Sequence, residues 1–397
     1  MADNFEKNLS TILFHEEKSR IDFQTIAPPI FQTSNFDFET FEGFVEGTSE
    51  EENHYIYTRG GNPTTRILEE KLMAIEGAEA AKVFSSGMAA ISSAIFSLVK
   101  SGDHILVLNI VYGSASAFIK SLERFGVSHS AILLESAHEI PNHIQKNTKV
   151  IYFESPSGQL FKLLDLETIS IVAKKQDIVT IIDNTWSSPL FQKPTQYGID
   201  LVIHSLSKYI GGHSDLVGGI VMGKEKFIRG IHSEGLQLLG GAISPNNAWL
   251  AIRGLRTLSL RMNHADESIR RVLDVLSKDS RINRIFHPYL AIPAQHGLAD
   301  KYLSGFGSLF SFDLSDQDFE KMKQFVNALQ IFKIAVSWGG YESLVLPSNR
   351  GIDDEKLRLR GLSSTHLRCY IGLEDTDLLI ADIKQALDKA YGGEGND

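Results

Sequence analysis

The sequence predicts an α/β fold, with a doubly wound, mostly parallel sheet in a large domain and a smaller α+β domain after it. Short apolar runs of strand length recur at Ile105–Leu108, Val150–Phe153, Val179–Ile182 and Leu201–His204. Continuous runs of this kind are typical of parallel strands that are covered on both faces. Segments with helical spacing separate them, and this alternation indicates a doubly wound sheet. Ligands of such sheets bind at the carboxyl ends of the strands.

The remaining elements follow from the same patterns. Thr65–Glu76 has helical spacing, and a short strand at 81–84 follows it. The alternation fades near residue 256. Beyond it we expect a long helical segment at about 247–277, apolar strands at Ser308–Phe312 and Leu367–Ile371, and a closing helix at Asp377–Tyr391. We therefore predict an N-terminal arm and loop at residues 1–62, a large domain at 63–256 and a small domain at 257–397.

Composition excludes several classes of protein. The chain has 397 residues, a net charge of −10 and one cysteine, so an intramolecular disulfide is impossible. No Cys/His cluster has zinc spacing, and we expect no metal. An acidic chain without a long Lys/Arg run does not favour nucleic-acid binding. No apolar run reaches the ~20 residues that span a membrane, and the N-terminus lacks the apolar core of a secretory signal. We expect a cytoplasmic enzyme.

A lysine after a predicted buried strand carries the strongest local signal. Leu201–His204 is followed by Ser205, Ser207 and Lys208, and then by a glycine-rich turn. An amine in this position is desolvated, which lowers its pKa, and a neutral amine can form a Schiff base. The two serines could hold a phosphate. Because a lone lysine after a strand is more often a surface residue, its context must decide.

Three further elements supply that context. Asp183 ends a predicted strand, where a carboxylate can keep a pyridinium nitrogen protonated or can simply be a turn residue. Ser85–Ala90 is a tight turn into a helix, whose N–H groups can bind phosphate while Gly87 permits close approach. Tyr112 follows a third strand, where its ring could stack on a cofactor or pack in the core.

Together these elements resemble the Cys/Met-metabolism family of fold-type I enzymes, which depend on pyridoxal 5′-phosphate. The resemblance covers about residues 20–390. Its signatures occur in order at Tyr57–Thr64, Ser85–Ala90, Ile182–Thr185, His204–Asp215, Arg253–Leu258 and Ile371–Asp375. The resemblance implies a mostly parallel, seven-stranded sheet in the large domain and a smaller α+β C-terminal domain.

The resemblance also implies roles for the matching residues. Lys208 would form the Schiff base with the cofactor and later move protons, and Asp183 would pair with the pyridine nitrogen. Tyr112 would stack on the ring and act as an acid or base. The remaining cofactor contacts within the chain would be Gly87, Met88, Thr185, Ser205 and Ser207.

Other matching residues would bind the substrate or a neighbouring subunit. Tyr57 and Arg59 would reach the cofactor phosphate of the neighbouring subunit, which suits an arginine's two-point capture of phosphate. A dimer with shared sites would then be obligatory, and the family is usually tetrameric. Arg368 would bind the substrate carboxylate, with Ser337 and Trp338 also lining the substrate site.

The resemblance implies an amino-acid thioether as substrate, and two stretches narrow which branch of the family the chain resembles. Many family members carry Glu-Ser-Pro-x-Asn-Pro, whereas Gly158 and Gln159 replace the Asn-Pro pair here. Trp338 stands where most relatives have leucine, and Ser337–Leu344 resembles the cystathionine β-lyase branch of the family. We therefore predict a carbon–sulfur lyase that converts cystathionine into homocysteine, pyruvate and ammonia.

Alternatives remain open. The same cofactor residues would serve γ-elimination from cystathionine or methionine, or γ-replacement on an acylated homoserine. A non-catalytic module that binds the cofactor is a remote alternative from another class, since fold alone does not establish function. An aminotransferase is possible in principle, but the family signatures argue against it. The keto acid released from each candidate substrate distinguishes the lyases.

Overall fold

The computed structural model describes residues 9–14, 25–49, 54–290, 293–351 and 354–392. Its larger sheet has the strand order β1-β7-β6-β5-β4-β2-β3. These strands are β1 (Ala80–Phe84), β2 (His104–Leu108), β3 (Ser128–Ile132), β4 (Thr148–Glu154), β5 (Val179–Asp183), β6 (Leu201–Ser205) and β7 (Gly219–Gly223). Strand β7 is antiparallel to both neighbours, and the other pairs are parallel. The prediction of a seven-stranded, mostly parallel sheet is confirmed.

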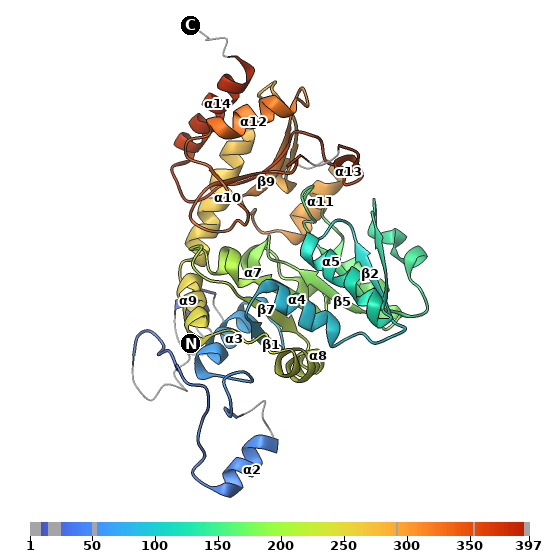
Figure 1. Ribbon diagram of the computed structural model, residues 1–397, viewed down its shortest axis with the longest axis vertical. Coiled ribbons are helices and arrows are strands. Elements are labelled where there is room, and N and C mark those ends of the chain that lie inside the picture. Colours follow the sequence, from blue (N-terminus) through green and yellow to red (C-terminus); the bar gives the residue numbers. More distant parts are fainter. Residues whose placement is uncertain (1–8, 15–24, 50–53, 291–292, 352–353, 393–397) are drawn as a thin grey trace.

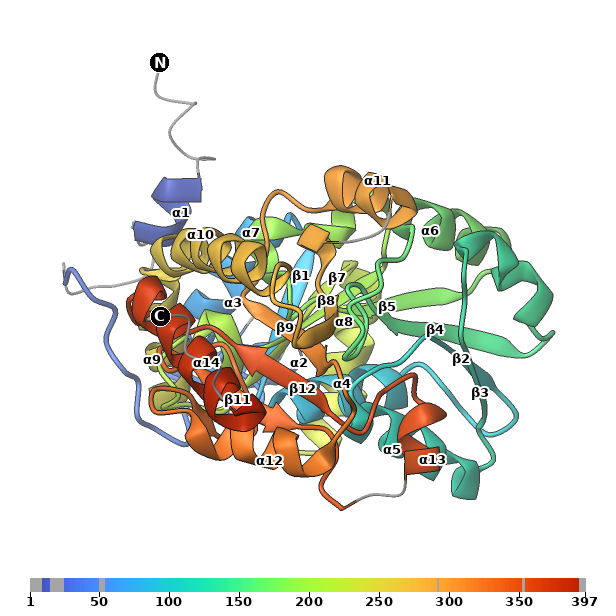
Figure 2. The same ribbon diagram turned by 90° about the horizontal axis from the view of Figure 1, so that it is seen from above.

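Helices cover both faces of this sheet (Figures 1 and 2). Helices α4 (Gly87–Phe96), α5 (Gly113–Ser121) and α8 (Glu225–Gly230) cover one face, and α3 (Pro63–Glu76), α6 (Leu166–Lys175), α7 (Ser188–Phe191) and α9 (Pro245–Leu255) lie on the other. Ile105 and Val107 of β2 pack with α4 and α5, whereas Leu106 and Leu108 of the same strand pack with α6. Burial on both faces explains the continuous apolar runs of the sequence.

Local sequence sets where helix α3 begins and ends. The Asn62 side chain caps it by accepting a hydrogen bond from the Thr64 N–H group at 2.9 Å, and Pro63 occupies the first helical position. Proline is favoured there because its missing N–H group would have no partner in the helix. Gly77 ends the helix with a positive φ of 78°, which glycine adopts without steric strain. Helix α3 therefore begins two residues before the predicted segment.

The C-terminal part contains a second sheet with the order β10-β11-β12-β9-β8. Its strands are β8 (Ile282–Phe286), β9 (Leu309–Leu314), β10 (Lys333–Ile334), β11 (Leu344–Pro347) and β12 (His366–Tyr370). The helices of this part are α10 (Leu258–Leu276), α11 (Pro293–Tyr302), α12 (Phe319–Ala328), α13 (Asp354–Arg358) and α14 (Thr376–Tyr391). Residues of α10, α12 and α14 share one apolar core with β9 and β12. The two predicted apolar strands and the closing helix are present.

Several features differ from the predicted elements or were missed, and these include strands β8, β10 and β11 and helices α11, α12 and α13 of the C-terminal part. The predicted long helical segment is broken between α9 and α10, near residue 256. The domain boundary predicted at that residue stays a prediction. Strands β3 and β7 were not anticipated. Neither were helices α1 (Leu9–Phe14) and α2 (Phe41–Ser49), and α2 projects away from the sheets (Figure 1). Across the described residues, no helix is both long enough and apolar enough to cross a membrane.

Candidate active site

Lys208 lies in a tight turn after β6. Its backbone is not helical (φ −101°, ψ −132°), although the residues around it form a helical turn. The buried Arg261 of α10 holds this turn, because its guanidinium donates to the carbonyl oxygens of Tyr209 at 2.6 Å and Gly254 at 2.8 Å. Gly254 is also needed for close packing, since a Cβ there would overlap the carbonyl oxygens of Ile210 and Gly211. The turn is thus anchored from two helices.

The Lys208 amine points toward the loop that precedes β11. Its Nζ atom donates a hydrogen bond to the Ser337 hydroxyl at 2.6 Å and lies 5.7 Å from the centre of the Trp338 ring. Burial lowers the pKa of Lys208 to about 8, the positive charge of Arg368 adds to this effect, and Asp183 opposes it. A substantial fraction of this amine can therefore be neutral near neutral pH.

The Ser337 loop presses directly on the Lys208 turn. Ser337 has a positive φ of 79°, which is strained for a residue with a side chain. A Cβ at Gly339 would lie 2.8 Å from the Cα atom of Lys208, so only glycine fits this approach. The Trp338 ring packs edge-on against Tyr209, with ring centres 5.3 Å apart. All three predicted substrate residues meet here, because Arg368 donates to the Ser337 carbonyl at 3.2 Å.

Side chains of β12 alternate between the two faces of the C-terminal sheet. Leu367 and Cys369 are buried in the core of the C-terminal sheet, while Arg368 and Tyr370 face the opposite side. The guanidinium of Arg368 therefore lies on the side of β12 that faces Lys208.

Asp183 ends β5 at the carboxyl edge of the large sheet. Its Oδ1 atom accepts hydrogen bonds from the Thr185 N–H group at 3.0 Å and the Thr185 hydroxyl at 2.5 Å. The Thr185 hydroxyl in turn accepts from the Ser205 N–H group at 2.9 Å. Burial raises the pKa of Asp183, while the Thr185 hydrogen bonds and the nearby His204 and Lys208 partly offset that rise. Thr185 thus fixes the orientation of the carboxylate relative to β6.

Helix α4 begins beside the end of β6. Ser86 caps the helix, its hydroxyl accepting from the Ala89 N–H group at 3.0 Å. A Cβ at Gly87 would lie only 3.0 Å from the Cβ atom of Ser205, so glycine permits this close approach. The Ser207 hydroxyl accepts from the Gly218 N–H group at 3.1 Å. This end of α4 brings N–H groups and the two predicted serines together, as an anion site requires.

Tyr112 lies at the edge of the same region and is held by a residue that sequence reasoning missed. The Tyr112 side chain is 54% exposed, and its N–H group donates to the Glu154 carboxyl at 2.5 Å. Glu154 ends β4 and is the direct neighbour of Asp183 on β5. The Glu-Ser-Pro stretch stands out in the sequence for its missing asparagine, yet its glutamate could have been found as a strand-end acid like Asp183.

Tyr57 and Arg59 are the two predicted residues that this chain does not bring to Lys208. The Arg59 guanidinium lies 5.5 Å from the centre of the Tyr57 ring and donates to the Gln237 side chain at 3.2 Å. The Tyr57 side chain is about half exposed. Their predicted action on a neighbouring subunit stays a prediction.

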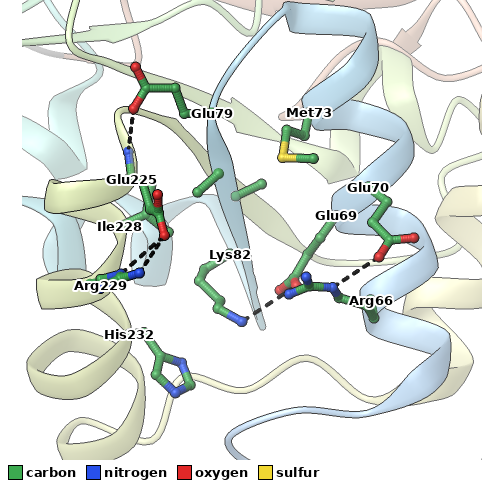
Figure 3. A pocket seen from close by; sticks show the side chains of 12 residues that line it. Arg66, Glu69, Glu70, Met73, Glu79, Lys82, Glu225, Ile228, Arg229 and His232 are labelled. Atoms are coloured by element: carbon green, nitrogen blue, oxygen red, sulfur yellow. Dashed lines mark hydrogen bonds and ion pairs between the residues drawn. The ribbon is translucent and has the colours of Figure 1, made fainter. Parts of the chain in front are cut away.

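A separate cavity of about 170 Å³ lies beside β1, between α3 and α8 (Figure 3). Its charged groups pair with one another: Lys82 lies 3.5 Å from Glu69, and Arg66 lies 3.0 Å from Glu70. Burial lowers the pKa of the adjoining His232 to about 4, which keeps that ring neutral. None of its described lining residues belongs to the Lys208 site, and the Lys82–Glu69 ion pair ties β1 to α3.

Comparisons with known proteins agree with this geometry. The family described as "Cys/Met metabolism PLP-dependent enzyme" matches residues 10–388. An L-methionine γ-lyase from Fusobacterium nucleatum subsp. nucleatum is 35% identical, covering 97% of this chain and 99% of that protein. A cystathionine β-lyase from Lactococcus lactis subsp. cremoris is also 35% identical, over 92% and 94% of the two chains. The structure of cystathionine γ-synthase from Xanthomonas oryzae pv. oryzae, in complex with cystathionine, has a TM-score of 0.89 at 31% identity. The match covers 97% of this chain and 99% of that chain.

Proposed function

The chain belongs to the Cys/Met-metabolism family of enzymes that depend on pyridoxal 5′-phosphate, and from this premise we propose that it cleaves the Cβ–S bond of cystathionine. Carbon–sulfur chemistry on a sulfur amino acid is common to the family. The balanced reaction is cystathionine plus water to homocysteine, pyruvate and ammonia. The observation that carries the proposal is the contact of the Lys208 amine with Ser337 beside Trp338 and Arg368.

The residues at the carboxyl edge of the sheet fit the cofactor. When bound, pyridoxal phosphate supplies an aldehyde that bonds to an amine and a ring that withdraws electrons from the substrate Cα atom. Lys208 would provide the amine and Asp183 would face the ring nitrogen. The phosphate would be held at the start of α4, where Gly87 approaches Ser205 closely, by Gly87, Met88, Ser205 and Ser207. Thr185 would hold Asp183 in place.

Arg368 would bind and orient the substrate. Its planar guanidinium can make two parallel hydrogen bonds to a carboxylate, and its position on β12 places that carboxylate near Lys208. The Trp338 ring lies on the same side of Lys208 and would exclude water from the Cα–H bond that breaks. Tyr112, exposed at the edge of the site, would cover the open face of the cofactor ring and exchange a proton with the substrate.

Lys208 would then take the Cα proton. Only the neutral amine is a base, and a lysine with a pKa of about 8 is neutral in about one molecule in ten at pH 7. An ordinary lysine is neutral in fewer than about one in a thousand. Its hydrogen bond to Ser337 would aim the Nζ atom once the amine is free. Positioned acid–base groups of this kind contribute about 10² to 10⁴ in rate.

The same proposal includes a homo-oligomer with sites shared across a dimer interface, assembled as a tetramer. Tyr57 and Arg59 lie away from Lys208 within one chain, and Arg59 keeps its guanidinium at the surface beside Gln237. Helix α2 precedes them and exposes Phe41 and Val45 to 74% and 48%. Exposed apolar side chains of this kind are typical of surfaces that another subunit covers.

A γ-elimination from methionine is the second candidate, because the F. nucleatum relative matches over 97% of this chain. Incubating the loaded enzyme with cystathionine and with methionine, and identifying the keto acid, separates the two. We expect pyruvate from cystathionine and little product from methionine. Release of 2-oxobutyrate as the main product would overturn β-elimination. Lys208→Ala is the negative control and should lose all turnover while keeping its fold.

A further inference from the structure

We propose that Glu154 is a positioning residue that fixes Tyr112 relative to Asp183 at the carboxyl edge of the sheet. The inference rests on the proposed function, because Tyr112 and Asp183 are placed against the same cofactor there. Glu154 itself lies behind these residues and is not assigned a contact with substrate. Its position follows from three independent observations on the described residues.

The first observation is that both carboxyl oxygens of Glu154 are occupied by backbone groups of two different loops. Oε1 accepts the Tyr112 N–H group at 2.5 Å, and Oε2 accepts the Gly158 N–H group at 3.3 Å. Tyr112 lies between β2 and α5, whereas Gly158 follows β4. One side chain therefore joins the loops at the ends of two adjacent parallel strands.

The second observation concerns how closely these loops approach. Gly158 has a positive φ of 54°, and a Cβ there would lie 2.8 Å from the Ile110 carbonyl oxygen. The loop that carries Tyr112 thus rests directly on the Gly158 turn. Tyr112 opens helix α5 without a side-chain cap, so the Glu154 carboxyl gives its N–H group a partner that the helix lacks. Glu154 thus holds the N–H side of Tyr112, while α5 holds its carbonyl oxygen, which accepts from the Ser116 N–H group at 3.0 Å.

The third observation is the pairing of Glu154 with Asp183. The two residues are partners in the β4–β5 register, and partners on parallel strands point to the same face. Tyr152 lies two residues earlier on the same face of β4 and is fully buried, and its hydroxyl has no hydrogen-bond partner among the described residues. Burial raises the pKa of Glu154 to about 8, with the charge of Asp183 adding to this effect, so Glu154 is mostly neutral at pH 7. Glu154 can therefore hold Tyr112 without adding a second charge.

Hydrogen–deuterium exchange on the cofactor-free protein tests directly whether Glu154 holds the Tyr112 and Gly158 N–H groups. The variants are Glu154→Gln, which keeps the side-chain volume but has one acceptor oxygen, and Glu154→Ala, which has none. The control is Glu320→Gln, an exposed acid on α12. Two peptides are followed, one containing Tyr112 and one containing Gly158. In Glu154→Gln we expect amide exchange to become about 3- to 10-fold faster in one of them, and in Glu154→Ala in both. The control should match the parent protein.

The loaded enzyme gives the second readout. Visible circular dichroism of the bound cofactor should change in Glu154→Gln, and kcat should fall about 10-fold or more, with KM nearly unchanged because Arg368 is untouched. Unchanged exchange at both peptides in either variant would overturn the proposal, as would unchanged kcat and dichroism in Glu154→Gln. If Glu154→Ala does not fold, Glu154→Gln alone decides. Failure of the proposed function would appear differently, as an unexpected keto acid from the parent enzyme.

Discussion

The amine nitrogen of Lys208 lies 2.6 Å from the hydroxyl oxygen of Ser337, although 129 residues separate them in the chain. This hydrogen bond joins the turn after β6 in the large sheet to the loop before β11 in the second sheet. The two parts meet at the amine that the proposed chemistry uses. Residues of both sheets therefore determine where that amine points.

Two substitutions of Ser337 should distinguish the effect of its hydroxyl group on catalysis from the effect of its backbone strain on stability. Ser337→Ala removes the hydroxyl, and Ser337→Gly also relieves the positive φ of 79°. We expect both variants to lose kcat about 10-fold or more, because each frees the Lys208 amine. Urea denaturation should find Ser337→Gly more stable than Ser337→Ala by about 1 kcal/mol. A normal kcat in either variant would exclude the hydroxyl from orienting Lys208.

Arg368 should tune the basicity of Lys208. Its positive charge opposes protonation of the amine, so Arg368→Gln should raise the pKa of Lys208 above about 8, toward the ordinary value of 10.5. The pKa can be measured in the cofactor-free protein by NMR with ¹³C-labelled lysine. Arg360→Gln, at an exposed position, is the matched control and should leave the value unchanged. No shift in Arg368→Gln would mean that burial alone depresses the pKa.

Glu154 should stabilise the cofactor-free protein at low pH and should lose this contribution as pH rises. The fold raises the pKa of Glu154 from 4.5 to about 8, mainly by burial and next by the charge of Asp183. The folded chain thus holds this proton more tightly than the unfolded chain does. The resulting stabilisation is complete below about pH 4.5 and is lost as pH rises through about 8.

Glu154→Gln cannot titrate and isolates this contribution. The free energy of unfolding from urea titrations at pH 5.5 and pH 8.5 should decrease less between the two values in Glu154→Gln than in the parent protein. Histidines titrate in both proteins, so the difference between them is the informative quantity. Equal pH dependence would contradict a raised pKa at this carboxyl.

Two glycines in helices provide a matched test of close packing. Gly254→Ala should destabilise the chain by about 1–3 kcal/mol, because its Cβ would overlap the carbonyl oxygens of Ile210 and Gly211. A Cβ at Gly230, at the end of α8, would meet no described atom within 4 Å other than those of its chain neighbours and its own helix backbone. Gly230→Ala should therefore be neutral or stabilise by about 0.5–1 kcal/mol. Denaturation midpoints of both variants measure these changes in stability. Cofactor affinity should fall only in Gly254→Ala.

The strands that sequence predicted best are buried on both faces and form mostly apolar runs of strand length, whereas the equally buried β7 has only three apolar residues between two glycines and was missed. β2, β4, β5 and β6 appear as continuous apolar runs, and Lys208 and Asp183 stand out because they follow such runs. β3 was missed because most of its residues are at least partly exposed, which breaks the apolar pattern. Helix α2 was missed because its apolar side chains are exposed, whereas the prediction relied on apolar side chains that pack in a core.

Some contacts in the site cannot be predicted from a local pattern of the sequence. Glu154 meets Asp183 through the register of β4 against β5, and its contact with Tyr112 spans 42 residues. The approach of Ser337 to Lys208 depends on how the second sheet packs against the large one. Predicting these contacts requires the tertiary arrangement, whereas the family signatures identify only the residues.

The position of Trp338 gives the chain an intrinsic optical reporter. Of its three tryptophans, Trp186 is buried in the core and Trp249 donates to the Pro28 carbonyl, so Trp338 alone has its indole over the Lys208 amine. A chromophore attached to that amine would lie close enough to quench its fluorescence by resonance energy transfer. Emission from unlabelled protein should thus report loading and release of the cofactor in real time.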